Sequence, residues 1–146
     1  MIIPLSTKSI QIVKESAELI TSNDTKITKR MYDILFKKYP NFKIFFKDAP
    51  ENQYMKLAEA LSAYATNVEK LHILRPALSV IAREHVRVKI KPVQYPIIGM
   101  ALIQAIEDVL GDTASLELID AWREVYKHIA NVLIEIEKEM YEIQEH

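Results

Sequence analysis

Glycine is scarce in this chain, with two in 146 residues, and this scarcity limits the fold more than any other feature. A β-rich domain of this size needs many tight turns, and such turns favour glycine or asparagine. Apolar residues recur instead at helical spacing, as in the stripe Ile10, Val13, Ala17 and Ile20. We therefore predict an all-α protein.

The apolar stripes and the residues that bound them predict the order of the helices. Tyr39 should end the second helix, because a residue before proline avoids the α region. Pro96 removes a backbone hydrogen bond, so the helix that contains it should begin late or irregularly. The predicted segments are helices through 10–20 and 27–35, a short apolar turn at 42–46, and helices at about 51–69, 75–86, 92–110 and 114–143.

Composition excludes several classes of protein. We find no internal repeat or linker, so residues 1–146 should form a single domain. Lys+Arg 19 against Asp+Glu 20 gives no electrostatic case for binding nucleic acid or an anionic membrane. There is no cysteine, the start MIIPLSTKSI has no signal-peptide pattern, and the apolar stretch PIIGMALI is short for a membrane span. We expect a cytoplasmic protein that binds neither membrane nor nucleic acid.

His85 is the histidine whose position suggests a ligand, because it continues the apolar stripe Leu78, Ile81 and Ala82. The others, His72, His128 and His146, should lie at a polar corner, on a solvated helix face and at the terminus. A histidine on an apolar face is more often a satisfied core residue than a ligand. Zinc is disfavoured because no second ligand stands at ligand spacing on the same face. One imidazole suits haem, whose porphyrin supplies four other donors.

Glu137 interrupts the apolar face of the last predicted helix. It lies at the margin of that face, so a carboxylate that reaches water at the edge is an equally good explanation. If it is buried it needs a hydrogen-bonding partner, and Tyr95 or His85 could provide one.

Several further residues have both an ordinary and a functional explanation. Gln53, Leu57 and Leu61 lie at i, i+4 and i+8 and share one helical face. Gln53 could simply be the exposed end of this stripe, and Tyr32 and Phe46 could be core aromatic residues. The ordinary explanations do not account for all of these residues occurring together in this order.

Seven strings across essentially the whole chain carry a resemblance to a known family. They are Met31-Tyr32-Asp33, residues 40–46 (PNFKIFF), 63–69 (AYATNVE), 81–85 (IAREH), 91–95 (KPVQY), Ala121-Trp122 with Tyr126, and Ala130-Asn131-Val132. With these strings the chain resembles the globins, in particular the bacterial flavohaemoglobins and single-domain haemoglobins. The resemblance implies a three-over-three helical sandwich around a haem pocket, with a short or absent D helix.

The same resemblance implies how the chain would hold haem b. His85 would be the proximal iron ligand, with Tyr95 and Glu137 as its hydrogen-bonded partners. Tyr32 and Gln53 would be the distal polar residues. Together with Tyr95 and Glu137, these two are the residues to which the resemblance assigns the chemistry.

The remaining pocket residues follow from the resemblance too. Phe46 would pack on the porphyrin and Leu57 would fill the space between the distal residues, while Leu61, Ile81 and Tyr126 would complete the pocket. The segment from Phe46 to Gln53 is shorter than in typical flavohaemoglobins, which bears on the distal geometry.

Two functions fit such a pocket. One is an enzyme that converts nitric oxide and O₂ to nitrate and depends on a separate reductase, since the sequence stops at His146 and should lack the flavin and nicotinamide domains. The other is a carrier that stores or delivers O₂ without turnover. O₂, NO and other diatomic gases are the expected ligands, and the expected state is a monomer or weak homodimer.

Overall fold

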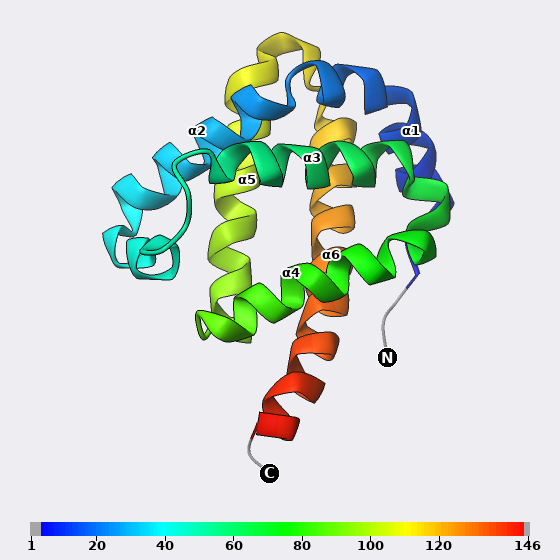
Figure 1. Ribbon diagram of the computed structural model, residues 1–146. Helices are drawn as coiled ribbons and strands as arrows, with labels where there is room; N and C mark the ends of the chain where they lie inside the picture. The colour runs from blue at the N-terminus through cyan, green and yellow to red at the C-terminus, as the bar shows by residue number, and fades with distance from the viewer. Residues whose placement is uncertain (1–3, 145–146) are drawn as a thin grey trace.

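The computed structural model describes residues 4–144, and all regular structure in this range is helical (Figure 1). The α-helices are α1 Thr7–Ser22, α2 Asp24–Lys38, α3 Gln53–Thr66, α4 Arg75–Arg87, α5 Tyr95–Leu110 and α6 Leu116–Gln144. Shorter 3₁₀ segments are η1 Pro40–Phe46, η2 Val68–Leu74, η3 Pro92–Gln94 and η4 Gly111–Thr113. The all-α prediction is confirmed.

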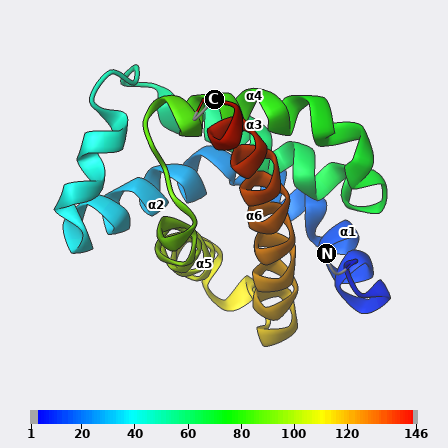
Figure 2. The ribbon, with the colours of Figure 1, turned by 90° about the horizontal axis from the view of Figure 1, so that it is seen from below.

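The helices form two crossed layers. In Figure 1, α3 and α4 run across α5 and α6, and in Figure 2 α3 and α4 lie along the top of the view with α5 and most of α6 beneath them. At the sides, α1 contacts α3 and α6, while α2 contacts α3 and α5. This is the expected three-over-three sandwich. Residues 47–52 form only turns and a bend, so no D helix separates η1 from α3.

The predicted boundaries are correct to within a few residues. Proline at position 40 ends α2 at Lys38, and η3 occupies the irregular start expected before α5. The helix expected over 51–69 is shorter, because the Asn67 amide donates to the Ala63 carbonyl (2.9 Å) and the chain continues as η2.

The apolar core depends on α5, which has eight buried residues along its length. With its flanking 3₁₀ turns it spans Pro92–Thr113, which by length and composition could cross a membrane. Length alone therefore does not exclude a span, contrary to the expectation from the sequence. Core helices pass the same test, and α5 packs against α2 and α6.

Gly99 allows α5 and α6 to come into close contact. A Cβ atom at this position would lie 2.4 Å from Cε2 of Tyr126, well inside van der Waals contact. The tyrosine ring therefore lies directly on the α5 backbone, and its hydroxyl donates to the Tyr95 carbonyl (2.6 Å).

Gly99→Ala should destabilise the protein by about 1–3 kcal/mol, because the new methyl group must displace the Tyr126 ring. Urea unfolding of a double-mutant cycle measures this coupling. In a Tyr126→Ala background the same change should cost nothing, since alanine is the better helix former. An equal loss in both backgrounds would show that the contact with Tyr126 is not the reason for the glycine.

Candidate functional site

His85 lies in the last turn of α4, on the face that packs toward α6. Leu78 and Ala82 on the same helix are buried, which fixes the orientation of α4. The imidazole is partly open, with 28% of its side chain exposed. The histidine that continues the apolar stripe is therefore held in place by the fold, while part of its imidazole ring remains exposed.

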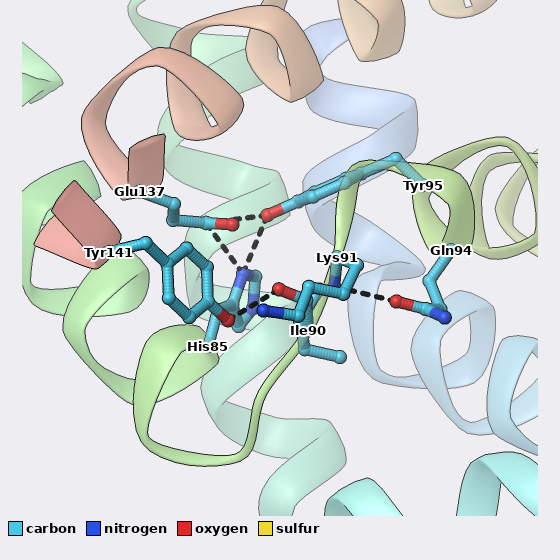
Figure 3. Close-up of polar contacts among 7 residues, drawn as sticks. All are labelled: His85, Ile90, Lys91, Gln94, Tyr95, Glu137 and Tyr141. Carbon is cyan, nitrogen blue, oxygen red and sulfur yellow. Dashed lines mark hydrogen bonds and ion pairs between the residues drawn. The ribbon is translucent and has the colours of Figure 1, made fainter. Parts of the chain in front are cut away.

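Three side chains from three helices meet at the Nδ1 atom of His85 (Figure 3). Nδ1 lies 2.8 Å from the Tyr95 hydroxyl and 3.1 Å from Oε2 of Glu137. The Tyr95 hydroxyl donates to the same Oε2 atom at 2.6 Å. Glu137 is buried, with 4% of its side chain exposed, so it is not a carboxylate at the edge of the apolar face.

This geometry determines which imidazole nitrogen carries the proton. A carboxylate only accepts hydrogen bonds, and the Tyr95 proton is already donated to Oε2. Burial, reinforced by Glu137, raises the pKa of Tyr95, so its hydroxyl remains a donor. Nδ1 must then carry the hydrogen that points at Glu137, which leaves the lone pair on Nε2. No described residue hydrogen-bonds Nε2, so it is free to bind a metal ion.

Further contacts hold the segment between α4 and α5 beneath this site. Tyr141 donates to the Ile90 carbonyl (2.7 Å), and the Lys91 ammonium lies over its ring (3.9 Å). The Lys91 N–H donates to the Gln94 side chain at 2.6 Å (Figure 3). The sequence analysis did not identify Tyr141. Its spacing of four residues from Glu137 on the same helix was the available signal.

Tyr126, expected in the haem pocket, contacts the backbone of Tyr95. Its hydroxyl bonds the Tyr95 carbonyl, so it holds in place the residue that contacts His85 and Glu137. Whether its ring also touches haem remains a prediction.

The distal residues come from α2, η1 and α3. The rings of Tyr32 and Phe46 meet edge to face at 5.2 Å between centroids. Phe36 contacts both rings, at 5.6 and 5.3 Å, and the sequence analysis missed it. Phe36 follows Tyr32 by four residues on α2, a spacing that places both on one helical face.

The polar atoms of the distal residues are unpartnered among residues 4–144. Burial raises the pKa of Tyr32, so its hydroxyl stays protonated, and no described residue accepts its hydrogen bond. Gln53 is half-buried as the first residue of α3, and its amide has no described partner either. Leu57 is half-buried one turn later, and Leu61 is buried in the core.

Haem suits these residues better than a bare metal ion. The described residues include no group of three His, Cys, Asp or Glu that could hold a metal. A porphyrin supplies four nitrogen donors and needs one axial ligand, and His85 presents one free nitrogen. Ile81 is also half-buried, on the same helix as His85, and provides apolar surface for such a group.

Two hollows lie away from His85. A groove of about 610 Å³ between α5 and α6 reaches Tyr95 and Tyr126. A smaller one of about 230 Å³ is lined partly by His72 and His128. His128 is half-buried there rather than solvated, which corrects the expectation from helical periodicity. His146 lies outside the described residues.

Fold and site together define a helical protein whose residues fit haem, with His85 as the candidate axial ligand. The Globin family model matches residues 29–133. An uncharacterized globin-like protein of Aquifex aeolicus is 44% identical over 94% of this chain and 97% of its own length. The chain therefore belongs to the globin family, and haem is its expected cofactor.

Solved structures agree with this assignment. RmaNOD from Rhodothermus marinus, solved as an engineered carbene transferase, is 32% identical, with a TM-score of 0.93 over 97% of this chain and 99% of that one. A globin from Campylobacter jejuni, also 32% identical, has a TM-score of 0.85 over 94% of this chain and 99% of its own.

Flavohemoproteins are similar only in part of their length. That of Rhodopirellula baltica is 41% identical over 96% of this chain but over 35% of its own sequence. The chain thus spans about a third of these relatives.

Tyr95→Phe and Glu137→Gln should each lower the iron–histidine stretching frequency of the ferrous protein, because both weaken the hydrogen bonding at Nδ1. Resonance Raman spectroscopy measures this frequency. Haem affinity should fall by about ten-fold or more. Tyr141→Phe is the matched control, since its hydroxyl bonds a carbonyl and not His85. An unchanged frequency in both test variants would contradict the proposed role.

Stability should decrease above pH 10, because burial raises the pKa of five tyrosines above the ordinary value of 10.0. They are Tyr32, Tyr64, Tyr95, Tyr126 and Tyr141. Below this pH all are neutral in both states; above it the unfolded chain ionises first and is favoured. The midpoint of urea unfolding, measured at several pH values between about 9 and 11, tests this expectation. Tyr64→Phe should flatten the decline, and an unchanged slope would contradict the cause.

Proposed function

We propose that this globin converts nitric oxide and O₂ to nitrate, using haem b and an external reductase. The observation that carries the proposal is the buried Glu137 carboxylate, which accepts hydrogen bonds from both His85 and Tyr95. A carboxylate at this position makes the imidazole a stronger electron donor. Strong donation favours electron transfer to a bound diatomic ligand.

Haem, when bound, supplies the iron that binds O₂ and one electron per turnover. The residues of the chain would orient the haem and stabilise its bound ligand. His85 would hold the iron through Nε2, while Glu137 and Tyr95 fix its tautomer. Tyr32 and Gln53 have unpartnered donors that can hydrogen-bond a diatomic ligand carrying negative charge. The electron lost in forming nitrate is returned by the reductase.

The relatives support the proposal through their names. RmaNOD is described as a candidate nitric oxide dioxygenase. Flavohemoproteins account for several of the most similar relatives, and a flavohemoglobin structure from Malassezia yamatoensis contains bound FAD and heme. In such a protein an electron source and a globin share one chain.

Oxygen storage or delivery is the second candidate. It is favoured by the alignment with flavohemoproteins, which is confined to about a third of their length. The 146 residues match only the globin part of these relatives, so turnover needs electrons from outside this part, and a carrier would need none.

Turnover distinguishes the two functions. Oxygenated protein is mixed with nitric oxide in a stopped-flow instrument, and nitrate is measured with NADPH and a ferredoxin–NADP⁺ reductase as electron donor. The proposal expects many nitrate molecules per haem. A single nitrate per haem, although the reductase still reduces the ferric protein, would reject enzymatic turnover and favour the carrier.

Tyr32→Phe should release O₂ roughly ten-fold or more faster, because a charge-assisted hydrogen bond is lost while the ring remains. Autoxidation should also rise. Gln53→Leu should have a smaller effect if it is the second donor. Tyr39→Phe, at the end of α2, is the control and should change neither rate. The reverse ranking, with Gln53 dominant and Tyr32 silent, would contradict this description of the pocket.

A further inference from the structure

Thr28 is a polar residue that none of the assigned roles explains. It lies on α2 and is fully buried, with 0% exposure. Its hydroxyl donates to the backbone carbonyl of Tyr54 at 2.7 Å. Tyr54 directly follows Gln53 in the first turn of α3, and Thr28 lies one turn before Tyr32 on α2. The hydrogen bond therefore joins the two helices beside both distal residues.

This hydrogen bond is not needed to complete either helix. A helical carbonyl such as that of Tyr54 already accepts from the N–H four residues later. The Thr28 hydroxyl could also turn to its own helix, but the Thr25 carbonyl is 3.4 Å away, a weaker geometry. The hydrogen bond that it makes therefore connects α2 and α3.

The start of α3 has few other anchors among the described residues. Asn52 precedes the helix without a side-chain capping bond. The backbone bonds at this point are local, from Gln53 to Pro50 and from Met55 to Asn52, both 3.0 Å. Beyond apolar packing, the polar contacts from α2 to this turn are the Thr28 bond and the Lys29 ammonium, 5.3 Å from the Tyr54 ring centre.

We propose that Thr28 is a positioning residue that sets the place of Gln53 relative to Tyr32. Thr28 and Tyr32 are four residues apart on one rigid helix. The hydrogen bond from Thr28 to α3 therefore fixes the position of α3 relative to Tyr32. The inference rests on the proposed distal roles of Tyr32 and Gln53, and it requires no particular reaction.

The chain contains a matched control for this bond. Ser62 on α3 donates to Asp24 on α2 at 2.7 Å. This bond joins the same two helices, but it lies nine residues further along α3 from Gln53. Ser62→Ala thus removes one hydroxyl bond between α2 and α3 without touching the turn that carries Gln53.

The experiment compares Thr28→Val, which keeps the shape and loses the hydroxyl, with Ser62→Ala in the haem-loaded protein. Hydrogen exchange should increase roughly five-fold in residues 53–57 for Thr28→Val, as expected for one lost hydrogen bond. The stretching frequency of bound carbon monoxide should shift, because it senses nearby donors. Ser62→Ala should accelerate exchange only further along α3 and leave this frequency unchanged.

Two more comparisons keep the result specific. Thr28→Ser retains the hydroxyl and Thr28→Ala does not, so this pair replaces the valine variant if that variant fails to fold. In a Gln53→Leu background, Thr28→Val should no longer move the carbon monoxide frequency.

Unchanged exchange in residues 53–57 for Thr28→Val would overturn the inference. An equal shift of the carbon monoxide frequency in Ser62→Ala would do the same. Failure to form nitrate would reject the proposed reaction only, since neither the exchange nor the carbon monoxide measurement depends on it.

Discussion

The buried carboxylate of Glu137 is the constraint on which the site depends. Burying an ionised carboxylate is very costly unless donors replace the water that it loses. Tyr95 and His85 provide these donors, at 2.6 and 3.1 Å, and they come from two other helices. The meeting point of α4, α5 and α6 is therefore fixed by charge as well as by packing. The same bonds place the lone pair of His85 on Nε2, so folding itself leaves this nitrogen ready for the iron ligand role that we propose.

The two sides of the site differ in how their polar groups are satisfied. On the proximal side, Glu137, Tyr95 and Nδ1 of His85 all bond one another. On the distal side, the Tyr32 hydroxyl and the Gln53 amide have no partner among the described residues. Both side chains are only half-buried, and neither has a fully buried polar atom that lacks a partner. Water can therefore hydrogen-bond these donors until a ligand supplies the acceptor.

The sequence predicted most of the fold, because glycine scarcity, helical stripes and the prolines at 40 and 96 are local signals. It left Glu137 ambiguous, since periodicity places a residue on a helical face but does not say how deeply a crossing helix buries its margin. The prediction that His128 is solvated was wrong for the same reason. The contacts of Tyr126 with Gly99 and Tyr95 depend on how closely two helices approach, which no single helix encodes.

The distal half is held by weaker means than the proximal half. The turns at 47–52 form a short connection between η1 and α3, and no side chain caps α3. A neutral hydrogen bond contributes about 1 kcal/mol, whereas a hydrogen bond to a charged group such as a carboxylate contributes about 1.5–3 kcal/mol. Small sequence changes near Thr28 can therefore move Gln53 while His85 stays in place. On the roles proposed above, the contact between Gln53 and a bound ligand can then change while His85 and the fold stay the same.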